Sequence, residues 1–134
     1  MDDELQRIFA LLLIIKTLIM KNLFSIIGLL FLATSCGSLT SNTTIKPANS
    51  FVLGNNEHGT FKVKVKNVSK NDLKIYRQPL TGGSHSSFIL KPDEISTVKV
   101  EKNTALVFSN QSKDTANVDL KVTGDIGLSM TYKK

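Results

Sequence analysis

The fold of this 134-residue chain is decided by the stretch that reads Phe61-Lys62-Val63-Lys64-Val65-Lys66, in which apolar and charged residues alternate one by one. Successive side chains of a β-strand point to opposite faces of a sheet, so this period of two predicts a strand with one buried and one wet face. Similar alternation, or a short run rich in β-branched residues, recurs at 73–76, 88–90, 95–100, 105–108, 116–122 and 126–132. No segment beyond Phe51 shows a helical period, so we expect an all-β domain.

Turn-forming residues lie between the predicted strands, because Asn, Asp, Ser and Gly tolerate turn dihedrals or hydrogen-bond to their own backbone. They occur at 69–72, 91–94, 111–114 and 123–125. Seven or eight short strands at a spacing of about 8–12 residues are typical of an antiparallel β-sandwich. A strand ending at Asn67-Val68-Ser69, then a strand, a long loop and Leu90-Lys91-Pro92-Asp93-Glu94, is similar to small immunoglobulin-like modules of bacterial envelope proteins. This resemblance implies an immunoglobulin-like order of the strands.

The N-terminal part of the chain has a different character, because it contains a long apolar run that begins behind Lys21 and ends at Cys36, the only cysteine. A short basic start, about ten apolar residues and small residues before a cleavage point are the parts of a secretory signal peptide. Residues 20–36 therefore resemble the signal of a bacterial lipoprotein, in which the cysteine thiol is joined to diacylglycerol before cleavage. The resemblance implies that Cys36 becomes the lipid-carrying first residue of the mature protein, and that an N-terminal hydrophobic helix precedes the β-domain.

The residues before Met20 do not fit such a signal, because Asp2, Asp3 and Glu4 give the chain start the wrong charge. The simplest interpretation is that translation starts at Met20 and that residues 1–19 come from a mis-assigned start. The alternative is one spanning helix over residues 8–32, which is long enough for a bilayer. Two lysines would then lie inside the span, at a cost of about 2.5–3.5 kcal/mol each on insertion scales. This alternative describes a single-span inner-membrane protein with a periplasmic β-domain.

The predicted organisation is a signal peptide at 1–35, a lipid-anchored tether at 36–50 and a β-sandwich domain at 51–134. The tether is expected because this segment consists mostly of Ser, Thr, Asn and Pro, with little apolar surface to bury. Gly37 differs from the aspartate that resembles an inner-membrane retention signal, and no acidic residue follows before Glu57. The resemblance therefore implies the periplasmic leaflet of the outer membrane, with the inner membrane or the cell surface as alternatives.

The chain carries 17 Lys and Arg against 11 Asp and Glu, which gives a net charge of +6. Lys62, Lys64 and Lys66 share one strand face at intervals of about 6.6–6.8 Å, and Lys74 would join them if the next strand pairs in phase. Such a patch suits anionic partners: anionic lipid, lipopolysaccharide or an envelope protein. Nucleic acid is not expected, because no aromatic residues are interleaved with the lysines. The alternative interpretation is a solvated face whose lysines prevent edge-to-edge strand pairing.

The longest predicted loop, residues 78–87, is the best candidate for a binding loop. Gly82 and Gly83 allow close backbone approach of a ligand, and His85 lies two residues further on. Loops on a rigid scaffold often carry function. The alternative interpretation is a mobile connection between two strands.

Ser84, His85 and Asp93 supply the residue types of a catalytic triad, but no nucleophile elbow or similar local motif accompanies them. We therefore expect a non-catalytic binding or scaffolding protein, with an envelope enzyme that uses the 78–87 loop as the alternative. No metal or cofactor is expected, since His58 and His85 are the only histidines and Cys36 is assigned to lipid.

Two short modification patterns are present. Asp114-Thr115-Ala116 resembles an O-glycosylation pattern of some envelope-exporting bacteria, with Thr115 as the acceptor, and the alternative is an ordinary turn before a strand. Asn42, Asn67 and Asn110 match Asn-x-Ser/Thr, an N-glycosylation pattern whose machinery a bacterial lipoprotein does not usually meet.

Overall fold

The computed structural model describes the backbone of residues 2–32 and 37–134, and the side chains of residues 2–20 and 37–134. The chain divides into two compact units, Met1–Cys36 and Gly37–Lys134. The two units differ in kind, since the first is helical and the second is built from strands.

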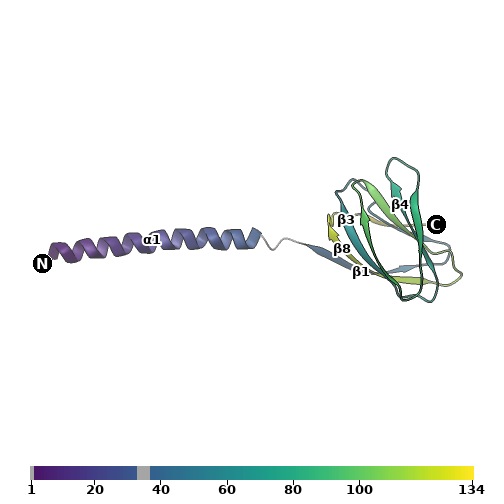
Figure 1. Cartoon of the computed structure of the whole chain (residues 1–134), viewed down its shortest axis with the longest axis horizontal. Coiled ribbons are helices and arrows are strands. Elements are labelled where there is room, and N and C mark those ends of the chain that lie inside the picture. Colours follow the sequence, from purple (N-terminus) through teal and green to yellow (C-terminus); the bar gives the residue numbers. More distant parts are fainter. Residues whose placement is uncertain (1, 33–36) are drawn as a thin grey trace. The chain divides into compact units, whose positions relative to one another are not determined.

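The first unit contains the helix α1 (Asp2–Leu32), drawn in Figure 1. Its first turn carries the acidic residues that the positive end of a helix dipole favours. Within the described part of the chain, no helix offers an apolar stretch long enough to cross a membrane. Cys36 lies outside the described residues, so its lipid attachment stays a prediction.

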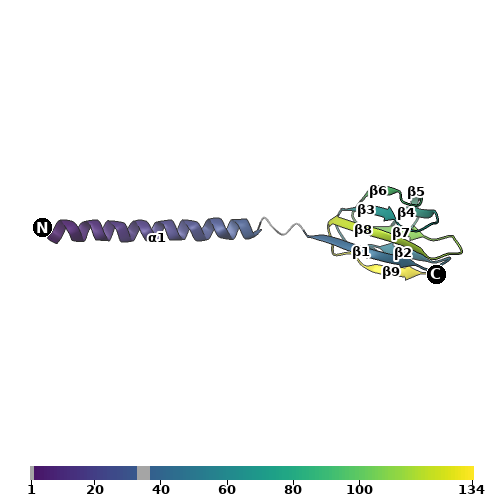
Figure 2. The same cartoon turned by 90° about the horizontal axis from the view of Figure 1, so that it is seen from below.

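The second unit, fully described from Gly37 to Lys134, folds into nine strands that form two antiparallel sheets. The four-stranded sheet has the order β1 (Ser38–Ile45), β8 (Ala116–Gly124), β3 (Phe61–Asn67), β6 (Ile95–Val100). The five-stranded sheet has the order β5 (His85–Leu90), β4 (Leu73–Pro79), β7 (Thr104–Ser109), β2 (Ser50–Leu53), β9 (Met130–Lys133). Figure 2 shows the strands of each sheet stacked in this order. The prediction of an antiparallel all-β domain is confirmed.

The connectivity of the strands differs from the immunoglobulin-like order that the sequence suggested. In an immunoglobulin domain the first, second, fourth and fifth strands share one sheet, whereas here β1 and β2 belong to different sheets. Nearly every connection changes sheet, and β4 and β5 are the consecutive strands that pair with each other. The orders 1-8-3-6 and 5-4-7-2 are those of a jelly roll, to which β9 is added beside β2. The expected immunoglobulin-like order is therefore wrong.

The segment expected to be a tether is an edge strand. Residues 38–45 form β1, which pairs with β8 from Ser38 opposite Thr123 to Ile45 opposite Ala116. Ile45 is fully buried and Thr43 is 3% exposed, so the strand contributes to the core. Two of its four inward positions, Ser41 and Thr43, are small polar residues, so the segment does not show a period of two in its apolar residues. The domain begins at Gly37, and not at Phe51 as predicted.

One hydrophobic cluster joins the two sheets. β3 contributes Phe61, Val63 and Val65, and the facing sheet contributes residues such as Ile75 and Phe108. All of its buried members belong to the strands of the second unit. That unit therefore contains its own core and is able to fold without the helix.

The loops gather at two ends of the domain. The first end carries residues 46–49, 68–72, 91–94 and 110–115. The second end carries residues 54–60, 80–84, 101–103 and 125–129. Backbone hydrogen bonds tie the loops of each end together: Asn110 N–H donates to Asn49 O at 3.0 Å, and Leu80 N–H donates to Asn103 O at 3.0 Å.

Candidate functional site

The outer side of the four-stranded sheet gathers lysines from three strands. Lys62, Lys64 and Lys66 alternate with buried residues along β3 and are exposed, as the sequence predicted. The register places Lys99 of β6 directly opposite Lys62, and Lys121 of β8 directly opposite Lys64. Both added lysines are exposed as well. We call these five lysines the basic face.

The basic face contains two like-charge pairs, Lys62 with Lys99 and Lys64 with Lys121. Cross-strand pairs contribute about 0.2–1 kcal/mol, and like charges directly opposite each other are destabilising. Asp119 stands opposite Lys66, but its Oδ1 already accepts a 2.6 Å hydrogen bond from Asn42 Nδ2. The arrangement therefore concentrates positive charge at a cost in stability.

Edge protection does not explain the lysines of β3 and β8. Exposed strand edges are commonly blunted by lysine, which prevents pairing with another chain. In this sheet β3 lies between β8 and β6, and β8 lies between β1 and β3, so neither is an edge. Lys62, Lys64, Lys66 and Lys121 consequently need another explanation.

Lys74 does not belong to the basic face, contrary to the prediction. It lies on β4 of the five-stranded sheet, where it stands opposite Ile89 of β5 and Ser109 of β7. The chain crosses to the other sheet through residues 68–72, and local alternation does not reveal whether the next strand pairs with the previous one or crosses over. For the same reason the sequence missed Lys99 and Lys121, which reach β3 from far along the chain.

An apolar residue borders the basic face. Ile95 of β6 stands opposite Lys66 and is 53% exposed. Together with Lys64, Lys66 and Lys121 it lines a shallow hollow of about 490 Å³ on this sheet. Lysines beside an exposed aliphatic side chain match an anionic surface that also has apolar parts, such as the headgroup region of a membrane.

The segment predicted as a loop over residues 78–87 is a loop only over residues 80–84, because β4 extends to Pro79 and β5 begins at His85. Gly82 and Gly83 have φ values of 106° and 82°, which L-residues with a side chain rarely adopt. A β-bulge between Tyr76 and Arg77 makes Ser86 an extra residue of β5, with a φ of 38°. The glycines serve this conformation, since no atom lies within 4 Å of the Cβ position of either one.

Arg77 links the beginning of β5 to the other sheet. Its Nη1 donates to Ser86 Oγ at 3.3 Å, while Nε and Nη2 donate to Lys99 O at 3.2 and 2.9 Å. A planar guanidinium with several donors is suited to holding such groups at once. Sequence reasoning missed this role, because nothing local to Arg77 indicates the carbonyl of Lys99 as its partner.

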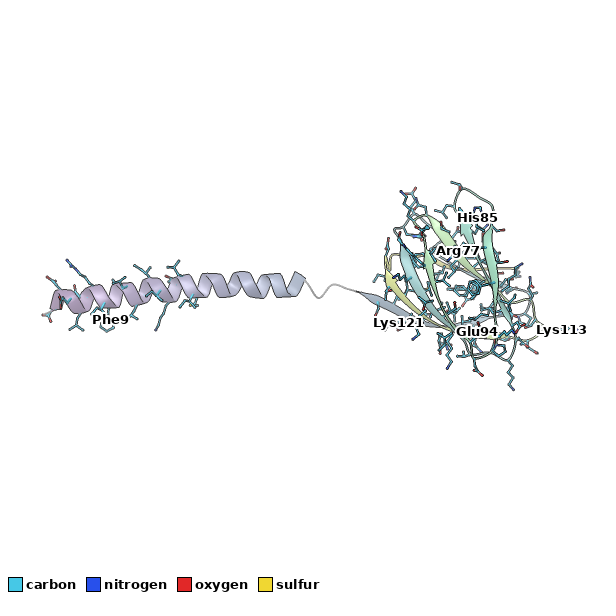
Figure 3. All side chains as sticks on the ribbon, viewed as in Figure 1. Phe9, Arg77, His85, Glu94, Lys113 and Lys121 are labelled. Atoms are coloured by element: carbon cyan, nitrogen blue, oxygen red, sulfur yellow. The ribbon has the colours of Figure 1, made fainter. Side chains whose placement is uncertain are left out.

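The residues Ser84, His85 and Asp93 are not brought together. His85 begins β5 near the second end, while Asp93 lies in the 91–94 loop at the first end. The six residues of β5 separate them by roughly 20 Å at 3.3 Å per residue. Figure 3 shows the same separation, with His85 at one end of the domain and Glu94 toward the other.

His58 is a loop anchor that the sequence did not reveal. The residue is 9% exposed, its Nε2 lies 2.9 Å from Thr104 O, and its ring packs edge-on against Phe61. The neighbouring Gly59 N–H donates to Asp125 Oδ2 at 2.7 Å. This hydrogen bond, a second from the Gly127 N–H, and the nearby His58 hold the pKa of Asp125 below its usual value of 3.8. Among the described residues, no three His, Cys, Asp or Glu side chains are grouped to hold a metal ion.

Two of the three Asn-x-Ser/Thr asparagines are structural. Asn67 is fully buried, and its Nδ2 donates to Asn71 O at 2.8 Å and to Leu90 O at 2.9 Å. Asn110 is 1% exposed and its Nδ2 donates to Asp114 O at 2.8 Å. In both loops a serine lies two residues after the asparagine, and its N–H and hydroxyl both donate to the asparagine Oδ1. The repeated pattern Asn-x-Ser-Lys-Asn/Asp is therefore a loop staple, and its amides are not available for a glycan.

The remaining modification candidates lie on the surface. Thr115 is exposed in the 110–115 loop immediately before β8, so its O-glycosylation stays a prediction. Asn42 is also exposed, and its amide nitrogen is engaged with Asp119.

No protein-family model matches this chain, and no curated protein is significantly similar to it. Among solved structures it resembles the capsular polysaccharide assembling protein CapF from Staphylococcus aureus, at 18% identity and a TM-score of 0.49, over 67% of this chain and 24% of CapF. It also resembles PirA, at 14% identity and a TM-score of 0.46, over 63% of this chain and 91% of PirA. A third likeness is the Yersinia pseudotuberculosis-derived mitogen, at 18% identity and a TM-score of 0.42, over 66% of this chain and 86% of the mitogen. The chain thus spans about a quarter of CapF. Likenesses of this degree carry no argument about function.

Proposed function

We propose that this protein is a lipid-anchored module of the cell envelope that binds an anionic lipid surface, without catalysis, through the basic face. The observation that carries the proposal is the clustering of lysines on interior strands, with two pairs of like charge directly opposite each other. Solubility alone does not require lysines directly opposite each other on neighbouring strands, where they repel each other. An anionic surface removes this repulsion when it binds.

The lipoprotein-like signal supplies the other half of the proposal. A lipid on Cys36 would be two residues, or about 7 Å of chain, from Ser38. Ser38 begins β1, which is an edge strand of the sheet that carries the basic face. In that sheet Thr40 of β1 stands opposite Lys121 of β8, and Lys121 stands opposite Lys64 of β3. Because most of the segment expected to be a tether forms β1, a lipid on Cys36 would keep this sheet close to the lipid headgroups.

The two attachments complement each other energetically. A single acyl chain gives only marginal membrane binding, and stable anchoring takes a second signal such as a basic patch. Each lysine near a negatively charged membrane contributes about 1 kcal/mol. We propose the periplasmic leaflet of the outer membrane as the location. The inner membrane, the cell surface, a single-span anchor and an envelope enzyme are the alternatives.

Vesicle binding of the isolated domain, residues 37–134, tests the basic face. Replacing Lys62, Lys64 and Lys66 with glutamine should weaken binding to phosphatidylglycerol vesicles by about a hundredfold, since three contributions of about 1 kcal/mol are lost. The matched control replaces Lys91, Lys102 and Lys113, which are exposed loop residues, with glutamine. It makes the same change in net charge away from the face.

Two results would contradict the proposal. Unchanged binding of the first triple variant would mean that the basic face does not contact the vesicle. An equal loss in both variants would mean that binding follows the net charge of the domain and not this surface. Added salt should weaken the wild-type domain, because exposed charges are screened.

A further inference from the structure

The five-stranded sheet carries a second hollow, on the side that faces away from the main core. Lys74, Tyr76 and Gln78 occupy alternate positions of β4 and line its length. Ser87 of β5 stands opposite Tyr76, and Ser109 of β7 stands opposite Lys74. The hollow has a volume of about 570 Å³ and also includes His85 and Gln111. None of these residues belongs to the basic face.

One side of this hollow adjoins a buried apolar cluster. Val52, Ala105 and Val107 form a small apolar cluster on the same side of the sheet, each about 1% exposed, and Tyr76 packs against it. The side chain of Tyr76 is therefore held by buried neighbours on its own side of the sheet. On the β5 side, the bulge and the hydrogen bond from Arg77 to Ser86 fix the segment that borders the hollow. Supporting groups of this kind hold a binding site in shape before a ligand arrives.

The chemistry of the lining is polar, with one aromatic surface and no carboxylate. Serine hydroxyls and glutamine amides both donate and accept hydrogen bonds, as the hydroxyls of a sugar require. Tyr76 offers an apolar surface beside these groups, and Lys74 supplies a positive charge. From Lys74 to Gln78 the strand runs roughly 13 Å at 3.3 Å per residue, which leaves room for more than one sugar ring.

We propose that this hollow binds a saccharide that carries a carboxylate, with the acid group at Lys74 and the sugar hydroxyls at the serine and glutamine side chains. A bare phosphate fits less well, because its multiple charges call for several cationic donors and not for a row of neutral ones. A nucleotide fits less well because base recognition relies on stacking against aromatic rings, and the residues that line this hollow include a single tyrosine, Tyr76, and no Phe or Trp. The site is independent of the proposed membrane attachment.

The experiment titrates the isolated domain, residues 37–134, with glucuronic acid, glucose and inorganic phosphate, followed by amide chemical shifts. We expect glucuronic acid to bind more tightly than glucose and phosphate, with shifts centred on Tyr76, Ser87 and Ser109. The variant Lys74→Met, which keeps the chain length and removes the charge, should weaken glucuronic acid about tenfold and leave glucose unchanged. Lys70→Met, at an exposed position of the 68–72 loop outside both the hollow and the basic face, is the matched control and should change neither sugar.

A second variant, Gln78→Ala, should weaken both sugars, because it removes a neutral hydrogen-bonding group. Spectra of the variants without ligand report whether the fold is intact. Absence of shifts in the hollow with either sugar would overturn the proposal. Binding of phosphate as tightly as glucuronic acid would overturn the saccharide and leave a simple anion site. Equal binding of the two sugars would overturn the role of Lys74.

Discussion

The staples at Asn67 and Asn110 lead to a sharp prediction about three asparagines that share one sequence pattern. Asn42, Asn67 and Asn110 all match Asn-x-Ser/Thr, yet the first is exposed and the other two are buried. We expect Asn67→Ala and Asn110→Ala to destabilise the domain strongly, and Asn42→Ala to leave it almost unchanged. The Asn-x-Ser/Thr pattern by itself gives no basis for this difference, so the prediction tests the tertiary structure directly.

The magnitude follows from the hydrogen bonds of Asn110. Its Nδ2 donates to Ile45 O at 3.0 Å, to Lys46 O at 3.3 Å and to Asp114 O at 2.8 Å. Its Oδ1 accepts hydrogen bonds from the N–H and the hydroxyl of Ser112 at 3.1 and 2.7 Å. At about 1 kcal/mol for each bond, with the weakest discounted, the loss is roughly 3–4 kcal/mol. That is a large share of the roughly 5–15 kcal/mol that stabilises a typical domain.

Urea unfolding and thermal unfolding of residues 37–134, both followed by circular dichroism, measure the effect. For a domain of this size, each kcal/mol lowers the melting temperature by about 4–8 °C, so both buried variants should lose roughly 12–30 °C. Asn42→Ala should stay within about 0.5 kcal/mol of the wild type, as exposed substitutions usually do. Asn67→Asp keeps the shape but presents an acceptor to Asn71 O and Leu90 O, so it should be at least as unstable as Asn67→Ala. If Asn110→Ala and Asn42→Ala lost equally little stability, the loop staple would be refuted.

Two further predictions concern Asp125 and Cys36. Hydrogen bonds from Gly59 and Gly127 lower the pKa of Asp125 below 3.8, so its stabilising contribution is present above that pH and is lost as the pH falls through the lowered value. Asp125→Asn should therefore have a lower free energy of unfolding than the wild type at neutral pH, and this difference in stability should shrink well below pH 3.8. If urea unfolding showed the same difference across this pH range, the stabilising role of the Asp125 carboxylate would be contradicted. Cys36→Ser should abolish metabolic labelling with palmitate, and it should release the protein from membranes or leave an uncleaved precursor. Equal labelling of the wild type and the variant would contradict the lipoprotein proposal.

The sequence alone determined which side chains of a strand share a face. In Phe61–Asn67 the alternation of apolar residues and lysines requires one buried and one exposed side, and the structure has both. Turn residues at 69–72 and 91–94 likewise marked the ends of strands, because their conformational preferences are local. Predictions of this kind succeed because the relevant forces act between residues that are close in the chain.

Only the tertiary structure decided which strands are neighbours. It separated Lys74 from the basic face, added Lys99 and Lys121 to it, and turned the expected tether into β1. The jelly-roll order has the same cause, since an alternating strand fits equally well beside many partners. Pairing is settled by the simultaneous burial of one core from segments that lie far apart in the sequence, and no local pattern contains that information.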